Sequence, residues 1–265
     1  MRTLNFDKLE TEFNITKLKS PDAMYSVKAI DLVNIDNMSE FLTYITPFIK
    51  ALDVAAAGAY FARWMGDVAL AQQYIASVYN SSLDVSLANL TIHVIPTKAR
   101  VPISFQIHNW TEEKAPRNDT NRREWLEQVL VAMYSESIRP LFMTLSMTTN
   151  WHIGQVWGQL PTKFEKYIES YMIEEATETV VKDRLMQDYM YLKEEIDSQV
   201  FGRKRNPFNV KFRMVEHMED SEKQVRMKHV CCLYHKTENG YYCYTCPYMR
   251  EEERAARRDI IRNSE

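Results

Sequence analysis

The fold class is decided by one stretch, LTIHVIPTKARVPISFQI at residues 90–107. Residues 90–95 and 101–107 alternate between apolar and polar side chains, which is typical of strands with one buried face. The turn-like residues 96–98 separate the two runs. They therefore predict a pair of antiparallel strands, and the similar alternation of residues 208–215 predicts a further strand.

Most of the remaining chain has the 3.6-residue apolar period of helices. The expected helical runs are residues 39–52 with Ser39 as the N-cap, 67–79, 119–134, 141–147 and 162–200. Within the first run, Pro47 either starts a fresh helix or lies inside one. Pro140 is expected to break the helix that precedes residue 141, because proline lacks the N–H that a helix interior needs. The sequence thus predicts an α+β fold, predominantly helical, with a modest antiparallel sheet.

The composition excludes several classes of protein. The chain has 265 residues, 45% of them hydrophobic and 26% charged, as in a soluble globular protein. A formal net charge of −3 is unlike the basic surplus of a general nucleic-acid binder. We expect no signal peptide and no transmembrane segment, because no apolar run reaches the required length, and therefore a cytoplasmic protein.

All four cysteines lie within residues 231–246, in the pattern C-C-x10-C-x2-C. Clustered thiols in a reducing compartment are typical of metal ligands rather than of a disulfide framework. A [2Fe–2S] cluster needs four thiolates, two on each iron. The spacing of Cys243 and Cys246 lets one short loop bind a single metal, and by elimination Cys231 and Cys232 would bind the other iron. The sequence does not determine which cysteines share an iron.

Two alternatives use the same residues. A structural zinc site takes four thiolates, or replaces one with His229 or His235, although an adjacent cysteine pair is unusual for zinc. A disulfide between neighbouring cysteines, or a set of inert buried thiols, needs no metal at all. We expect the two histidines to be neighbours of the site, able to donate hydrogen bonds to sulfur, rather than ligands.

The chain between the cysteines contains a hairpin signal, Asn239-Gly240. A regular ladder through this turn would set Cys243 opposite Lys236, four residues from Cys232. That separation is roughly 13 Å along a strand, too far for one compact cluster. If all four thiolates share a site, the ladder must break before Cys243.

The cysteine spacing, its place near the C-terminus and the chain length resemble the FhuF-type ferric siderophore reductases. Cys231, Cys232, Cys243 and Cys246 match the cluster ligands of that family one for one. The short strings Trp157-Gly158-Gln159 and Asn206-Pro207-Phe208 also look similar to the family.

One position departs from the resemblance. Similar proteins often have a basic residue close before the paired cysteines, but here Val230 precedes them and the nearest basic residue with a long, permanently charged side chain is Lys228. Such a departure affects the electrostatics of the cluster rather than its ligation.

The resemblance implies a cytoplasmic oxidoreductase that reduces siderophore-bound Fe(III) and releases Fe(II). Similar proteins act on hydroxamate-type siderophores, so a ferric hydroxamate is the expected substrate. A [2Fe–2S] cluster would carry the electron by outer-sphere transfer, so that no catalytic acid, base or nucleophile is needed. The six glycines are isolated and form no dinucleotide-binding or P-loop motif. We therefore expect a separate electron-donor protein, such as a ferredoxin.

The region before the cysteines predicts the domain organisation. A boundary at residues 202–207 divides a mainly helical FhuF-like domain, residues 1–201, from a C-terminal cluster-binding segment, residues 202–265. The densest basic run, Arg203, Lys204 and Arg205, is a candidate for binding an anionic siderophore or an acidic donor, and is otherwise a solvated loop. The mixed charges of residues 251–265 predict an exposed helix or a frayed tail.

Two other functions use the same features. One is a siderophore-binding module that zinc stabilises, and the other is an iron–sulfur redox sensor that controls a partner. The sequence contains no DNA-reading motif, which argues against direct control of transcription.

Overall fold

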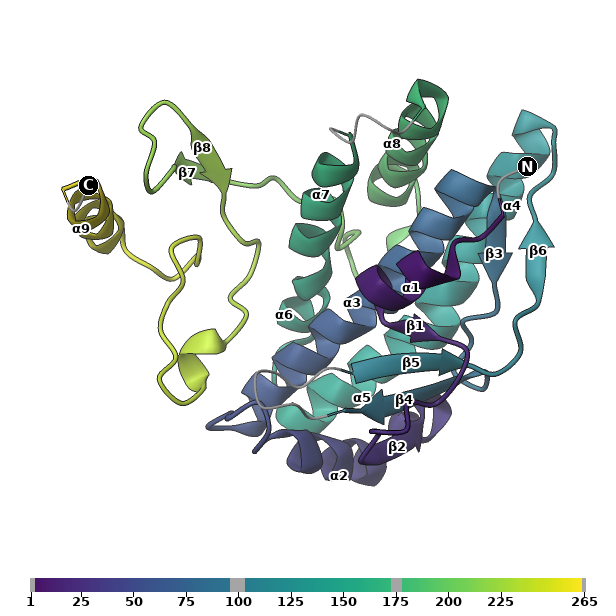
Figure 1. Ribbon diagram of the computed structural model, residues 1–265, viewed down its shortest axis with the longest axis horizontal. Coiled ribbons are helices and arrows are strands. Elements are labelled where there is room, and N and C mark those ends of the chain that lie inside the picture. The colour runs from purple at the N-terminus through teal and green to yellow at the C-terminus, as the bar shows by residue number, and fades with distance from the viewer. Residues whose placement is uncertain (1–2, 96–102, 173–177, 264–265) are drawn as a thin grey trace.

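The computed structural model describes residues 3–95, 103–172 and 178–263 (Figure 1). Helices dominate it and small sheets accompany them, which confirms the predicted α+β class. The expected turn at residues 96–98 lies outside the described residues. Within the described part of the chain, no helix has both the length and the apolar character that crossing a membrane requires.

The elements follow one another in this order. The α-helices of the described ranges are α1 (Phe6–Phe13), α2 (Ile35–Ile45), α3 (Val54–Tyr79), α4 (Asp119–Ala132), α5 (Arg139–Thr149), α6 (Ile153–Trp157), α7 (Gln159–Met172), α8 (Thr179–Glu194) and α9 (Glu251–Arg262). Shorter helical segments are η1 (Ala29–Val33), the π-helix η2 (Met133–Ile138), η3 (Ser198–Phe201) and η4 (Tyr234–Lys236). The strands are β1 (Ile15–Thr16), β2 (Tyr25–Lys28), β3 (Ser81–Leu83), β4 (Leu90–Val94), β5 (Ile103–Ile107), β6 (Glu112–Lys114), β7 (Met214–Glu216) and β8 (Gln224–Arg226).

Helix α3 is the centre of the main core. It is buried on nearly every side, as expected of a helix that is apolar all round. Asp53 caps its first turn by accepting a hydrogen bond from the amide of Ala56, at 2.8 Å. Its many alanines and glycines let neighbours approach closely, and α7 and α8 pack along it.

The main sheet has the strand order β1-β5-β4-β2. Strands β4 and β5 pair antiparallel, with Leu90 opposite Ile107, as the sequence predicts. The sheet as a whole is mixed rather than antiparallel, because β1 runs parallel to β5. Asn14, in the left-handed conformation, turns the chain between α1 and β1, and its carbonyl accepts a hydrogen bond from the amide of Phe105.

Several predicted helix boundaries are wrong. Helix α2 begins at Ile35 rather than after Ser39, because the side chain of Asn34 caps it. It ends at Ile45, just before Pro47, and no α-helix follows among the described residues until α3. Pro140 does not interrupt the helix. The π-helix η2 leads directly into α5, where Pro140 lies in the first turn and needs no N–H partner.

The predicted helix over residues 162–200 is also wrong as one element. Helix α7 ends at Met172 and α8 begins at Thr179, after Glu178 in an extended conformation. The two helices pack against each other and against α3. The sequence contains no sign of this division, because the helical pattern of residues 162–200 has neither glycine nor proline.

The predicted strand over residues 208–215 is reduced to β7, which pairs with β8. Phe208 instead packs in the main core, with its ring 5.0 Å from that of Phe164. Asn206 fixes the approach by donating hydrogen bonds to the carbonyls of Leu192 and Ile196. The division of the chain near residue 202 stays a prediction, although Phe208 on its C-terminal side belongs to the main core.

A second, smaller apolar cluster lies beside the start of α3. It combines two alanines of α3 with residues of the cysteine segment: Ala56, Ala59, Cys231, Leu233, Cys246 and Met249. In Figure 1 the segment that carries the cysteines and α9 lies to the left of α6 and α7, away from the main sheet. The cysteines therefore lie at one side of the helical body.

Candidate functional site

The four thiols are arranged as two pairs. The sulfur atoms of Cys231 and Cys246 are 3.7 Å apart, and the Cys243 thiol makes a hydrogen bond to Cys232. The sequence leaves open which cysteines share an iron, and in the structure each close pair joins cysteines that are not neighbours in sequence. Within the described ranges, no three His, Cys, Asp or Glu side chains are grouped as ligands of one metal ion.

The chain between the pairs curls instead of forming a hairpin. Residues 234–236 form the 3-10 segment η4, and Asn239 adopts a left-handed φ of 59°. Gly240 is required there, because a Cβ atom would lie 1.9 Å from the carbonyl oxygen of Tyr234. The chain thus departs from a regular ladder before Cys243, which is the condition that the sequence sets for bringing the four thiols together.

Lys228 is the basic neighbour of one thiol pair. Its ammonium lies 3.2 Å from the sulfur of Cys232 and 3.2 Å from that of Cys243. The hydrogen bond from Cys243 and then the charge of Lys228 lower the pKa of Cys232 to about 4, while the pKa of Cys243 is raised. Burial alone would lower the pKa of Lys228, but the two sulfurs outweigh it and raise that pKa.

The other pair has a different environment. Burial raises the pKa of Cys231 to about 12. Its sulfur accepts a hydrogen bond from the amide of Leu233, at 3.4 Å, and lies 3.6 Å from Nδ1 of His235. The His235 ring packs on Tyr242, with 4.4 Å between centroids. His235 is therefore a neighbour of the thiols as expected, whereas the ring of His229 packs on Phe212.

The string Trp157-Gly158-Gln159 positions the first two cysteines against the helical body. Gln159 is buried and donates a hydrogen bond to the carbonyl of Cys231, at 3.0 Å. At Gly158 the chain approaches Val230 so closely that a Cβ atom would lie 2.5 Å from a Val230 methyl group. Trp157 lies in the aromatic core and anchors the turn.

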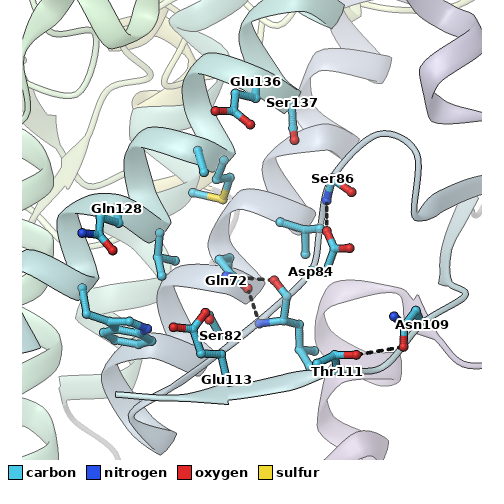
Figure 2. Close-up of a pocket in the computed structure, with 16 residues that line it drawn as sticks. Gln72, Ser82, Asp84, Ser86, Asn109, Thr111, Glu113, Gln128, Glu136 and Ser137 are labelled. Atoms are coloured by element: carbon cyan, nitrogen blue, oxygen red, sulfur yellow. Dashed lines mark hydrogen bonds between the residues drawn. The ribbon is translucent and has the colours of Figure 1, made fainter. Parts of the chain in front are cut away.

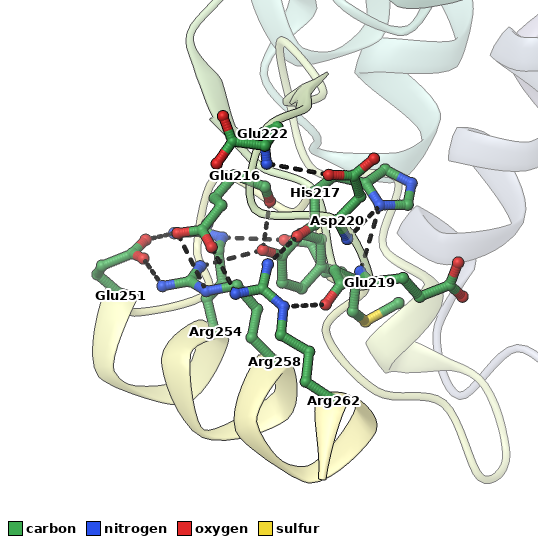
Figure 3. Close-up of polar contacts among 11 residues, drawn as sticks. Glu216, His217, Glu219, Asp220, Glu222, Glu251, Arg254, Arg258 and Arg262 are labelled. Carbon is green, nitrogen blue, oxygen red and sulfur yellow. Dashed lines mark hydrogen bonds and ion pairs between the residues drawn. The ribbon is translucent and has the colours of Figure 1, made fainter. Parts of the chain in front are cut away.

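Helix α9 packs against the segment that carries the last two cysteines, and Figure 3 shows its Arg254, Arg258 and Arg262 among the carboxylates of Glu216 and Glu251. Arg254 is buried and donates hydrogen bonds to the carbonyls of Tyr244, at 2.9 Å, and Cys246, at 2.7 Å. Further along the helix, Arg258 and Arg262 reach Glu216 of β7. Residues 251–262 form the helix that the sequence predicts, and most of its side chains are exposed or half-buried. It is not a frayed tail, because Arg254 is buried and docks one face of the helix on the cysteine loop.

A pocket of about 560 Å³ opens beside Cys232, between α3, α7 and the cysteine segment. We call it the basic pocket. Its chemically distinctive side chains are Tyr60, Arg63, Trp64, Lys163, Lys166, Lys228 and Cys232. Among the described residues that line it there is no carboxylate. Asp67 lies behind the lining and pairs with Lys163, and burial raises the pKa of Asp67 and lowers that of Lys163.

The basic run predicted as a binding element lies elsewhere. Arg203 is half-buried, near Gly154, while Lys204 and Arg205 are exposed. None of the three lines the basic pocket. Sequence reasoning missed Arg63 and Lys166 because each is a single basic residue in a helix, and only the folded chain brings them beside Cys232.

A second pocket, also of about 560 Å³, lies between α3, α4, η2 and the turn after β3 (Figure 2). Its polar lining is acidic and neutral, with Asp84, Glu113 and Glu136, and the described residues that line it include no lysine or arginine. Gln72 ties its wall together by pairing with the main chain of Leu83. It contains no thiol and is separate from the cysteine site.

Comparison with known proteins adds no identification. No model of a protein family matches the chain, and a search of curated proteins finds no match either. The likeness to the FhuF-type reductases therefore rests on the cysteine spacing and stays a prediction.

Proposed function

We propose that this protein is an iron–sulfur oxidoreductase that reduces Fe(III) bound to a siderophore. The observation that carries the proposal is the arrangement of the thiols as two pairs, one of them beside Lys228 and an open pocket. Two pairs suit a [2Fe–2S] cluster, which takes two thiolates on each iron, whereas a tetrahedral zinc ion needs four ligands around one point.

Each pair is assigned to one iron. Cys231 and Cys246 would hold the first iron and Cys232 and Cys243 the second, in line with the sulfur contacts. When bound, the cluster supplies one electron at a time. Oxygen chelators hold Fe(III) far more tightly than Fe(II), so a single electron loosens the metal.

The residues of the chain position and tune the site. Lys228 places a positive charge where an added electron is stabilised, and Gln159 and Arg254 fix the main chain at Cys231 and Cys246. The basic pocket gives a substrate access to the Cys232 side. A cytoplasmic location and a separate electron-donor protein, such as a ferredoxin, complete the proposal.

The test is the spectrum of the protein purified without oxygen. We expect a red-brown protein with two iron and two sulfide per chain, an EPR signal on reduction, and reoxidation by a ferric siderophore. Cys232→Ser and Cys246→Ser should each abolish the colour, while Thr245→Ser, between the last two cysteines, should keep it. A colourless protein with stoichiometric zinc would refute the proposal and favour the zinc-stabilised binding module.

The same protein sample distinguishes a reductase from a redox sensor. A protein that holds the cluster but whose reduced form is not reoxidised by any ferric chelate would fit a sensor rather than a reductase. Rapid reduction of the cluster by NADPH alone would contradict the need for a donor protein.

A further inference from the structure

We infer that the basic pocket selects a net-anionic ferric chelate, with carboxylate or catecholate oxygens on the iron, over a neutral hydroxamate complex. This inference rests on the proposed function and names its substrate class. It departs from the hydroxamate substrate that the resemblance implies.

The charge of the pocket is the first argument. Arg63, Lys163, Lys166 and Lys228 line it, and among the described residues no acidic side chain does. Lys163 is paired with Asp67 and Lys228 faces two thiols, so these two charges are largely compensated. No salt bridge to Arg63 or Lys166 occurs among the described residues, and both are exposed.

The charge of the substrate is the second argument. Three hydroxamates balance the charge of Fe(III) and give a neutral complex that gains little from free cations. Catecholates, and hydroxycarboxylates such as citrate, leave the complex anionic. Arg63 and Lys166, two exposed cations without a salt bridge among the described residues, line the concave site and attract such a complex.

The walls supply the third argument. The rings of Tyr60 and Trp64 lie edge to face with centroids 5.9 Å apart, on the same helix as Arg63. They give the pocket an apolar side on which the organic backbone or an aryl ring of a chelate can pack. At about 560 Å³ the volume is in the range of pockets that hold a small molecule.

The position relative to Cys232 connects binding to the electron. Cys232 lines the pocket itself, so a bound chelate lies against the thiol pair that Lys228 accompanies. A cluster held by the four thiolates would supply the one electron that reduces Fe(III) to Fe(II), and the one-electron donor protein would restore it. Protons from water would replace the metal on the freed chelator.

The test measures binding without electron transfer. Gallium(III) complexes have the same charge and shape as the ferric ones but accept no electron at accessible potentials. Quenching of tryptophan fluorescence, with Trp64 in the pocket, would be followed for gallium citrate, a gallium tris-catecholate and a neutral gallium hydroxamate. We expect the anionic complexes to bind at least tenfold more tightly than the neutral one, and their affinity to fall with salt.

Variants test whether the cations of the basic pocket cause the selectivity for anionic complexes. Arg63→Gln and Lys166→Gln should each weaken the anionic complexes by about tenfold and leave the neutral complex unchanged, while Arg63→Lys should retain most of the affinity. Lys204→Gln/Arg205→Gln is the matched control, because it removes two exposed charges outside the pocket. Tighter binding of gallium citrate than of the gallium tris-catecholate would identify a hydroxycarboxylate siderophore as the substrate. The reverse order would identify a catecholate siderophore.

The outcomes for the two proposals are distinct. Equal or tighter binding of the neutral complex, or a loss of binding in the Lys204/Arg205 control alone, overturns the inference even if the protein is a functional reductase. Selective binding of anionic complexes by a protein that holds no iron–sulfur cluster supports the inference and overturns the proposed function.

Discussion

At the scale of single residues, Lys228 is the side chain that we expect to have the largest effect on the proposed iron–sulfur site. Its ammonium contacts two sulfurs from different parts of the segment, Cys232 and Cys243. An electron added to a cluster held by these thiolates increases the local negative charge. A fixed cation at this distance therefore stabilises the reduced state over the oxidised one.

Replacing Lys228 tests that role. Lys228→Met should keep the cluster but lower its reduction potential by on the order of 100 mV, the size of one Coulomb interaction in a partly buried site. Lys228→Arg should stay close to the wild type, since it preserves the charge. The potentials would be measured by redox titration followed by EPR, and an unchanged potential in Lys228→Met would rule out the electrostatic role.

The sequence predicted some of these residues and not others. The four cysteines are recognisable as a set because their spacing in sequence is itself the signal. Lys228 is noticeable only as the nearest lysine before the pair, and its contact with Cys243 depends on the curl of the chain. Arg254 gives no signal, because its partners are main-chain carbonyls that carry no residue identity.

At the scale of elements, α9 acts as a brace for the cysteine loop. Its buried Arg254 satisfies the carbonyls of Tyr244 and Cys246, and Arg257 does the same for Tyr242. A buried carbonyl without a donor costs about 1–3 kcal/mol. Loss of this helix face would therefore destabilise the loop more than the loss of exposed arginines would.

Arg254→Met removes the brace while preserving most of the side-chain volume. We expect it to lower the free energy of unfolding of the C-terminal segment by about 2–4 kcal/mol and to reduce the bound iron. Arg250→Met is the control, because Arg250 is exposed and its side chain makes no cap hydrogen bond at the start of α9. Iron analysis and limited proteolysis would measure both effects, and equal iron content in the two variants would contradict the brace.

The contact between Asp53 and Lys236 joins the start of α3 to η4, at 2.6 Å. Burial alone would raise the pKa of Asp53, but hydrogen bonds from Lys236 and the amide of Ala56 outweigh it and lower the pKa. A pKa that is lower in the folded than in the unfolded state stabilises the fold above the unfolded value. That stabilisation is lost as the pH falls through the folded pKa.

Asp53→Asn separates the charge from the cap, because asparagine also caps helices. We expect a loss of about 0.5 kcal/mol at pH 7, since both side chains are partly exposed, and no difference from the wild type well below pH 4. Urea unfolding at both pH values measures it. A difference that persists at low pH, or that survives in a Lys236→Met background, would show that the ion pair is not its cause.

The predictability of the elements depends on how local their signals are. The β4–β5 pair was predicted because alternation within each strand and the chain between them are local features. The division between α7 and α8 has no local breaker and follows from packing along α3. The sequence predicted that the hairpin around Asn239-Gly240 must be interrupted if the four thiols are to meet. It did not predict the path of the chain there, because that path depends on main-chain contacts with Lys50 and Ala51, which are far away in sequence.

At the scale of the whole molecule, the chain has apolar cores of very different size. The main core extends from Leu4 to Phe208, whereas the cluster around Cys231 and Cys246 contains only six buried residues. So small a core is marginal without additional bonds. The segment after residue 227 is therefore expected to depend on bound metal, and the helical body is not.

Hydrogen exchange of the protein with and without its metal tests this dependence. Removal of the metal should increase exchange mainly in residues 228–250 and leave the amides of α3 beyond Ala59 protected. Mass spectrometry of peptic peptides resolves the two regions. A uniform increase over the whole chain would indicate that both cores unfold together.

The order of the thiol pairs along the chain has a consequence for the protein in air. Cys232 and Cys243 lie between Cys231 and Cys246, so the two pairs are nested, and each sulfur's nearest partner is distant in sequence. Without metal, oxygen would form a Cys232–Cys243 disulfide and a Cys231–Cys246 disulfide before it linked the adjacent Cys231 and Cys232. Each disulfide lowers the mass of the chain by two hydrogens, one from each thiol. The oxidised protein would keep the path of the chain between Cys232 and Cys243 but would not take up iron. A thiol reductant would have to reduce both disulfides before a cluster could be inserted.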